Sequence, residues 1–369
     1  MASSITLGKN IFSLRKEARL TQDDLASFLG VTKASVSKWE TGQSFPDIEL
    51  LPKIATYFGV TTDEIIGYEP QMSKQEISRE CARLRAAFAE KPFEEVHAEC
   101  QQLVRDYYSC FPLLASIVSL YINHASLADM DARMALLDEA LSICRHIRRN
   151  ASSSADVKQA EGIESGVLLM MGKPEEVVEL LHDTVEVDVG ADIVLSNAYS
   201  ALGQLEAADK TLQSSLFQSL VLDVNRLSQL GMLHAADREK LDQTHTRALV
   251  LIEAFEMESI YLNCGVIHLS FAMAYLKGGD AQAALDCLED YERALRKLEF
   301  PLKLHGDAYF DKLEDWIEEQ TTMDASVPRD DALIKKSMVE SVTANPAFAV
   351  LADDPRFLRI VASLEEIAR

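Results

Sequence analysis

Glycine, proline and long apolar runs are scarce in this chain, and their scarcity narrows the fold class. Only 15 glycines and 10 prolines occur in 369 residues, so turn signals are few and long helices are favoured. No run of about 18 apolar residues is present, which excludes a transmembrane helix and a membrane partner. Alanine, leucine, glutamate and aspartate are frequent instead. The sequence therefore predicts an all-α protein of two or three domains.

Cysteine and histidine lack the spacing that metal sites and disulfide frameworks need. The six cysteines form no C-x-x-C pair, and no Cys/His cluster has zinc-ligand spacing. They fall in apolar helical segments, where a free cysteine packs as a small hydrophobic residue. The first ten residues, MASSITLGKN, lack the apolar stretch of a signal peptide. We therefore expect a reduced, cytoplasmic protein without a metal or other cofactor.

Basic residues are outnumbered, and the imbalance is uneven along the chain. The net charge is −23, of which residues 1–69 contribute −2 and the other 300 residues contribute −21. An acidic surface repels phosphate groups and anionic membranes. Any contact with nucleic acid must therefore come from a local face near the N-terminus.

The first 69 residues contain helix signals in close succession. Apolar residues spaced as on one helix face occur in ITLGKNIFSLRKEARL, residues 5–20. Thr21, with Asp24 three residues later, predicts the start of a second helix, and Gly30 predicts its end. Thr32 and Gly42 bracket a third helix in the same way. The segments 47–59 and 61–68 predict a fourth and a short fifth helix.

The third segment, TKASVSKWETG (32–42), has two distinct faces when it is placed on a helix. Val36 and Trp39 share the face that can pack on the second helix, so Trp39 is predicted to be a core residue. Lys33, Ala34, Ser37 and Lys38 point the other way. Two short helices joined by a tight turn, the second exposing basic and small polar side chains, form a helix-turn-helix. Such a helix fits the DNA major groove, where lysine donates to guanine.

Residues 7–66 resemble the Cro/C1-type helix-turn-helix family, also called the XRE family. The resemblance rests on LRKEARLTQDDLASFLGVTKASVSKWETGQSFPDIELLPKIATYFGVTTDEII. It implies a five-helix, lambda-repressor-like fold, with residues 32–38 in the groove and Gln22 on a phosphate. It also implies that Arg15 and Glu40 pair inside the domain. The predicted DNA-binding residues are Gln22, Thr32, Lys33, Ala34, Ser35, Ser37, Lys38 and Gln43.

Beyond a predicted linker at 70–78, residues 79–369 are predicted to be helical and to carry a repeat. Three segments share the pattern Y/L-x3-G-x4-A/V-x3-L, in which a glycine ends one helix, a small residue permits close packing and a leucine fills the seam. They are Leu168–Leu181, Tyr199–Leu212 and Tyr275–Leu288, with a weaker fourth at Leu227, Gly231, Ala236 and Lys240. This array is similar to the tetratricopeptide (TPR) repeat, an α-solenoid. Residues of about 345–369 are predicted to be capping helices.

A helix-turn-helix followed by such an array resembles the peptide-sensing regulators of the Rgg/PlcR type. The resemblance implies a transcriptional regulator whose body dimerises and binds a peptide or other ligand, with asparagines on the inner helices holding the ligand. The candidates are Asn197, Tyr199, Asn225, Tyr261 and Asn263. A homodimer would bind a roughly palindromic operator in double-stranded DNA.

Two alternatives to this regulator remain open at the level of sequence. In the first, the array is a scaffold for a protein partner, antitoxin-like or polymerase-interacting, without any small ligand. In the second, the helix-turn-helix is vestigial and only dimerises, which the intact Gln22, Lys33 and Lys38 argue against. An enzyme is not expected, because the chain has no glycine-rich phosphate loop, G-x-S-x-G or H-E-x-x-H motif.

Overall fold

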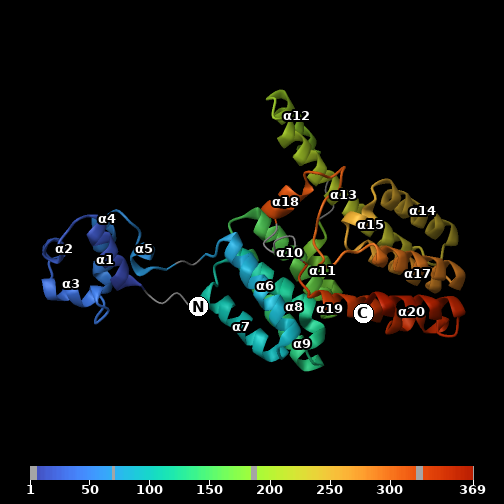
Figure 1. Ribbon diagram of the computed structural model, residues 1–369, viewed down its shortest axis with the longest axis horizontal. Coiled ribbons are helices and arrows are strands. Elements are labelled where there is room, and N and C mark those ends of the chain that lie inside the picture. The colour runs from blue at the N-terminus through green and yellow to red at the C-terminus, as the bar shows by residue number, and fades with distance from the viewer. Residues whose placement is uncertain (1–5, 69–70, 184–188, 321–326, 369) are drawn as a thin grey trace.

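The computed structural model describes residues 6–68, 71–183, 189–320 and 327–368. Within these ranges all regular secondary structure is helical and no β-strand is present, which confirms the predicted all-α class. Figure 1 shows the first five α-helices as a small unit beside a larger helical body. No helix in the described ranges is both long and apolar enough to cross a membrane.

The small unit has the five α-helices that the sequence predicts. Their bounds are α1 (Leu7–Glu17), α2 (Gln22–Leu29), α3 (Lys33–Glu40), α4 (Leu51–Phe58) and α5 (Thr62–Ile66), with a 3-10 turn at Ile48–Leu50. One side chain or more from each α-helix enters a common core that includes Ile11, Leu25, Val36, Ile54 and Ile65, all fully buried. This core fixes the position of α3 relative to its neighbours.

The body begins earlier than the sequence predicts. Helix α6 starts at Lys74, inside the range 70–78 predicted to be a linker, because Ser73 and Glu76 form a capping box. Residues 69 and 70, at the predicted boundary, lie outside the described residues. The helices of the first half of the body are α6 (Lys74–Glu90), α7 (Phe93–Asp106), α8 (Phe111–His124), α9 (Met130–Asn150) and α10 (Ser154–Met170).

The second half of the body continues with ten helices of unequal length. They are α11 (Pro174–Leu181), α12 (Ala191–Ala201), α13 (Leu205–Leu233), α14 (Arg238–Ala254), α15 (Met257–Ile260), α16 (Cys264–Lys277), α17 (Ala281–Arg296), α18 (Leu313–Gln320), α19 (Asp331–Thr343) and α20 (Pro355–Ala368). Further 3-10 turns occur at Ala125–Leu127, in the first half of the body, and at Pro346–Leu351, in the second half. The region predicted to hold capping helices thus contains a 3-10 turn followed by α20.

Two separate hydrophobic cores hold the body together. One joins α6–α10 and the other joins α13–α20. Between them, α11 buries no residue fully and α12 buries only Ser196. The connection between the halves therefore depends on few apolar contacts from these two helices.

All six cysteines are free and buried, as the sequence predicts for small hydrophobic residues. Burial raises the pKa of Cys81 to about 11 and that of Cys264 to about 12. Both thiols are therefore protonated at neutral pH and have little of the thiolate that nucleophilic or redox chemistry needs.

Three of the four repeat segments form the expected turn between two helices. Gly172, Gly203 and Gly279 all have positive φ, and each lies between the end of one helix and the start of the next. In each case the residue after the glycine donates its backbone N–H to the carbonyl of the first repeat residue, Leu168, Tyr199 or Tyr275, at 2.9 Å. This local geometry confirms the three hairpins; a regular TPR-like solenoid stays a prediction.

The fourth repeat segment was wrongly predicted. Gly231 does not end a helix, because it lies inside α13, where it is buried. A Cβ atom at this position would lie 2.6 Å from Cε1 of Phe271 on α16. Gly231 therefore permits close packing of two helices rather than a turn. The second segment, Tyr199–Leu212, shows a smaller departure, since Leu212 is 43% exposed instead of filling a seam.

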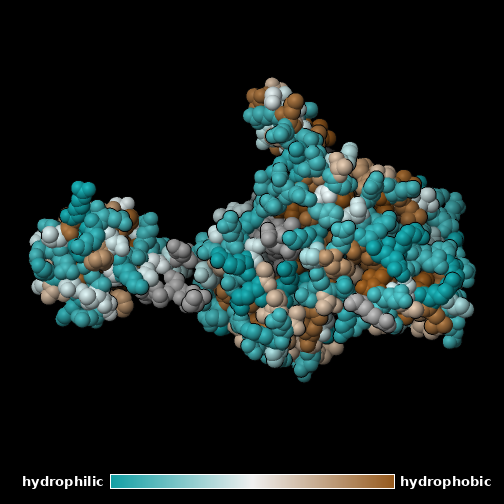
Figure 2. Space-filling view, in the orientation of Figure 1, coloured by the Kyte–Doolittle hydropathy of each residue, from teal (hydrophilic) through white to brown (hydrophobic). Residues whose placement is uncertain are grey.

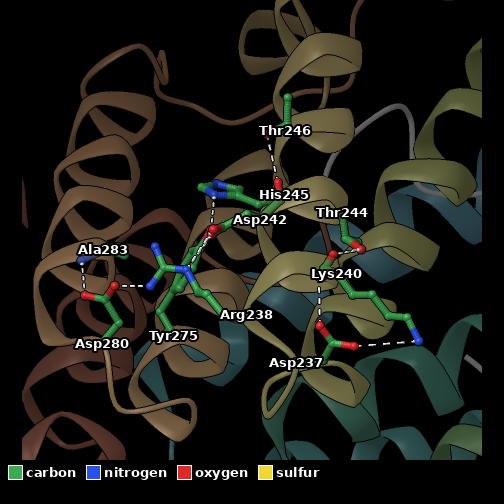
Figure 3. Close-up of polar contacts among 10 residues, drawn as sticks. All are labelled: Asp237, Arg238, Lys240, Asp242, Thr244, His245, Thr246, Tyr275, Asp280 and Ala283. Atoms are coloured by element: carbon green, nitrogen blue, oxygen red, sulfur yellow. Dashed lines mark hydrogen bonds and ion pairs between the residues drawn. The ribbon is translucent and has the colours of Figure 1, made fainter.

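Polar contacts tie α14 to the hairpin of α16 and α17 (Figure 3). Arg238 donates from Nε to both oxygens of Asp242 at 2.8 Å, and from Nη1 to Asp280, the N-cap of α17. The hydroxyl of Tyr275 donates to Asp242 at 2.8 Å. The hydrogen bond from Arg238 is the main reason why the pKa of Asp242 is lowered. These contacts bring charged and aromatic groups together for packing, and nothing in them requires a ligand.

Candidate nucleic-acid interface

Local sequence signals set the bounds of α2 and α3. Thr21 Oγ1 accepts the N–H of Asp24, and the Asp24 carboxylate accepts the N–H of Thr21 at 2.8 Å, so α2 starts with a capping box. Gly30 ends α2 in the left-handed region, with φ of 71°. Thr32 Oγ1 then accepts the N–H of Ser35 and starts α3. The two helices are therefore joined by the tight turn that a helix-turn-helix needs.

The two faces of α3 divide as predicted. Val36 and Trp39 are 0% and 4% exposed and lie in the core of the small unit, so Trp39 is a packing residue. The predicted DNA-binding residues Thr32, Lys33, Ala34 and Lys38 are exposed, and Ser35 and Ser37 are partly buried. Gln43 is exposed just beyond the helix. The exposed face of α3 thus presents two lysines and small side chains on a helix that is held firmly from behind.

A buried ion pair holds the C-terminal end of α3 against α1. Arg15 donates from Nε to Glu40 Oε1 at 2.6 Å and from Nη2 to Oε2 at 2.8 Å, and both side chains are about 95% buried. Arg15 also donates to the carbonyl of Leu20 at 2.8 Å. Burial raises the pKa of Glu40, but hydrogen bonds from Arg15 and Gln22 outweigh it, so the net shift is downward. The structure confirms the pairing that the family resemblance implies.

Gln22 occupies the first position of α2, where the sequence predicts a contact with phosphate. In the structure its Nε2 donates to Glu40 Oε2 at 2.9 Å, a contact the sequence analysis missed. The amide nitrogen carries two hydrogens, so one remains for a phosphate oxygen near the positive end of the α2 dipole. The contact with DNA stays a prediction, but Gln22 is already oriented by the ion pair.

The sequence analysis also missed a partner for Lys33. Its Nζ lies 2.7 Å from Oδ2 of Asp23 on α2, and both side chains are more than half exposed. Exposed ion pairs contribute little stability, on the order of 0–1 kcal/mol. Lys33 can therefore leave Asp23 for DNA at a low free-energy cost.

Gly8 on α1 allows the close approach of α1 and α3. A Cβ atom on Gly8 would lie 2.2 Å from the carbonyl oxygen of Trp39. A glycine inside a predicted helical segment can signal such an approach, and the sequence analysis did not use it. Together, Gly8 and the Arg15–Glu40 pair fix how far α3 stands out from the domain.

The predicted ligand residues of the body divide into two groups. Asn225 donates from Nδ2 to the hydroxyl of Tyr261 at 2.9 Å, and Tyr261 and Asn263 line a cavity of about 580 Å³. Asn197 and Tyr199 lie on α12, which does not border that cavity. The structure therefore brings three of the five residues together and leaves the other two apart. Among the described residues, no group of three or more His, Cys, Asp or Glu side chains could hold a metal ion.

These features define a helix-turn-helix DNA-binding domain. The helix-turn-helix family model matches residues 11–65. The prophage-derived HTH-type transcriptional regulator YonR of Bacillus subtilis is 30% identical over 82 residues, which are 22% of this chain and 76% of the relative. The HTH-type regulator MJ0272 of Methanocaldococcus jannaschii is 44% identical over 50 residues, 14% of this chain and 76% of the relative. The chain belongs to the helix-turn-helix family of transcriptional regulators, and not to an enzyme family.

Another relative is matched over a smaller share of its own length. The HTH-type transcriptional activator BcrR of Enterococcus faecalis is 43% identical over 56 residues, which are 15% of this chain. This match spans only 28% of the length of BcrR. The apo form of the competence regulator ComR from Streptococcus vestibularis aligns over 86% of this chain and 98% of its own. At 13% identity and a TM-score of 0.27, that alignment supports no argument about this chain.

Proposed function

We propose that this regulator is a homodimer that binds a roughly palindromic operator through α3 and senses a peptide or other small ligand with its body. The observation that carries the proposal is the exposed face of α3, where Lys33, Ala34 and Lys38 stand clear of the core. Lysines at these places can donate to guanine edges or phosphates, and Ala34 can contact a thymine methyl group. In this proposal residues 1–69 bind DNA in the cytoplasm, and residues 79–369 sense and dimerise.

The charge distribution supports DNA contact through the small unit alone. Residues 1–69 carry a net charge of −2, against −21 for the rest of the chain. Non-specific DNA affinity depends mostly on neutralising phosphates with cationic side chains. The body adds repulsion rather than attraction, so bound DNA would be limited to sites where α3 makes specific contacts.

The exposed apolar side chains of α12 support a homodimer. Ile193, Val194 and Leu195 are 57%, 66% and 46% exposed, and Asp192 is the only charged residue in α12. Figure 2 shows hydrophobic residues gathered where α12 projects from the body. Exposed apolar patches mark interaction surfaces. Two copies of an acidic body repel each other over most of their surface, so a face with little charge is where they can meet.

Selection of genomic DNA fragments by the purified full-length protein tests the proposal. A single enriched motif with dyad symmetry, bound by a particle of twice the chain mass of 41.0 kDa in sedimentation, is the expected result. Each half-site should lie about one helical turn from the other, or a multiple of it. A monomer, or a motif without symmetry, would contradict the homodimer. No enriched motif, together with a stable protein partner, would favour the scaffold alternative.

A further inference from the structure

Arg329 is an arginine that forms no ion pair with any carboxylate among the described residues of this acidic protein. It precedes α19 and is partly buried. It donates from Nε to the carbonyl of Asn123, from Nη1 to Ser337 Oγ at 3.0 Å and from Nη2 to Ser126 Oγ at 3.4 Å. Among the described residues no acidic group forms an ion pair with it. Three of its five N–H groups are used, so one on each terminal nitrogen can still bind an anion.

The environment of Arg329 favours an anion. Burial lowers the pKa of Arg329, and among the described residues no carboxylate forms an ion pair that would raise it. An arginine keeps its charge in proteins nonetheless. A partly buried cation without a counter-charge is costly, and a carboxylate held by the planar fork of its N–H groups would offset that cost.

Arg329 lies on the wall of the cavity of about 580 Å³. That volume falls in the range of small-ligand sites, roughly 300–1,000 Å³. Most of the described wall is apolar, and Arg329 is its only charged side chain. Examples from several elements are Leu262, Val266, Leu295, Leu302, Ile334 and Met338. An occupant that matches this wall has one negative charge and an apolar part.

The cavity lies where the two halves of the body meet. Asn123 belongs to α8, whose helix is part of the first core, while Leu269 and Tyr291 belong to α16 and α17 in the second core. The guanidinium of Arg329 bridges these parts, because it contacts α8 through Asn123 and α19 through Ser337. An occupant would therefore contact residues from both halves of the body.

We propose that this cavity binds an amphipathic monocarboxylate, with the carboxylate on Arg329 and the apolar part against α16 and α19. This inference rests on the proposed sensing function and names the chemistry of its ligand. Asn263, which lines the cavity and is exposed, offers an amide group that can bind a second polar group of the ligand. The same chemistry is found in a fatty acid and in the C-terminus of a short apolar peptide.

Calorimetric titration of the full-length protein without DNA separates these two sources. The probes are octanoate against octanol, and acetylated leucyl-leucyl-phenylalanine with a free carboxylate against the same peptide as its amide. In at least one pair, we expect the acid to bind about tenfold or more tightly than its neutral partner, because hydrogen bonds from Arg329 to a charged carboxylate are stronger than those to a neutral group. The pair that shows the difference identifies the source.

Arg329→Gln should abolish the preference for the acid, and Arg329→Lys should keep part of it. Arg133→Gln is the matched control, since Arg133 also donates to backbone carbonyls near the end of α8, those of Ala125 and Ala128. Val266→Trp, which fills the cavity while leaving Arg329 in place, should weaken binding of both members of a pair. Circular dichroism melting of each variant shows whether it is folded.

Equal affinity for acid and neutral probes, an unchanged preference in folded Arg329→Gln, or no binding of any probe would overturn the inference. Each of these results leaves operator binding by α3 intact, since the titration contains no DNA. Conversely, carboxylate binding that leaves operator affinity unchanged would support the site and contradict the proposed sensing function.

Discussion

Arg15 and Glu40 join the first helix of the chain to the last residue of α3 through two parallel hydrogen bonds of 2.6 and 2.8 Å. The pair is almost fully buried, and Gln22 adds a third hydrogen bond to the same carboxylate. Gln22, which is predicted to contact phosphate, and α3, which is predicted to contact bases, are therefore both held by the Arg15–Glu40 pair, the anchor of this unit. Changes at this anchor should affect both the stability of the domain and the position of α3.

Glu40→Gln should destabilise the small unit by about 3 kcal/mol, because it leaves Arg15 as a buried charge without a counter-charge. Trp39 is buried in this unit and Trp316 is the only other tryptophan. In a Trp316→Phe background, the fluorescence of Trp39 during urea unfolding reports on this unit alone.

The matched control is Asp23→Asn, which breaks the exposed Lys33–Asp23 ion pair of the same unit. It should change the free energy of unfolding by less than about 1 kcal/mol. Equal effects of the two substitutions would contradict the structural role assigned to the buried pair.

The same pair predicts a loss of stability in acid. The folded-state pKa of Glu40 lies below its usual value of 4.5. The contribution of the pair is therefore complete above about pH 4.5 and is lost as the pH falls through the folded pKa. The urea midpoint of unfolding, followed by Trp39 fluorescence, should decrease as the pH is lowered from 6 to 3. The decrease should be steeper in the parent than in Glu40→Gln.

Some dependence on pH should persist in Glu40→Gln. The pKa values of Asp24 and Glu64 are also lowered, by hydrogen bonds from the capping residues Thr21 and Thr61. An identical slope in parent and variant would show that Glu40 is not the main titrating group of this unit.

Asp23→Asn should strengthen operator binding by a few-fold, since it frees Lys33 and removes a negative charge beside α3. Fluorescence anisotropy with a labelled operator duplex at several salt concentrations measures the change. Asp63→Asn on α5 changes the net charge equally and serves as the control. Weaker binding by Asp23→Asn would indicate that Asp23 itself accepts a hydrogen bond from DNA or orients Lys33 for it.

Two glycines inside body helices should respond to alanine in opposite directions. Gly231→Ala should lower the melting temperature of the body, because the new methyl group overlaps the buried ring of Phe271. Overpacking of this kind costs about 1–3 kcal/mol. A methyl group at Gly166 on α10 meets no neighbouring atom. Gly166→Ala should therefore raise the melting temperature, because alanine favours the helix over glycine by up to about 1 kcal/mol. Differential scanning calorimetry compares the two; stabilisation by both would contradict the close packing of α13 and α16.

Sequence alone predicted what is encoded locally. Thr21, Asp24, Gly30 and Thr32 act within a few residues of themselves, so the bounds of α2 and α3 followed from cap signals. The buried face of α3 followed from helical spacing. Gly172, Gly203 and Gly279 were recognised for the same reason, since each turn closes within five residues.

What sequence did not predict depends on contacts between distant segments. Gly231 looks like a helix end until Phe271, 40 residues later, is seen to occupy the space of its missing side chain. Arg329 was not singled out, because its contact with Asn123 spans 206 residues of chain. Asn197 and Asn225 are both asparagines, but Asn197 lies on α12, away from the cavity, whereas Asn225 contacts Tyr261 of the cavity wall. The residue type alone does not show this difference.

The central claim is that α3 reads DNA through the face bearing Lys33 and Lys38. The most direct test is the affinity of Lys33→Ala/Lys38→Ala for the motif selected by the parent protein, with Trp39 fluorescence confirming that the unit is folded. We predict that site-specific binding is lost. The slope of log affinity against log salt for the residual binding should fall by about one for each lysine that contacts a phosphate. Unchanged specific binding by the folded double variant would contradict the claim.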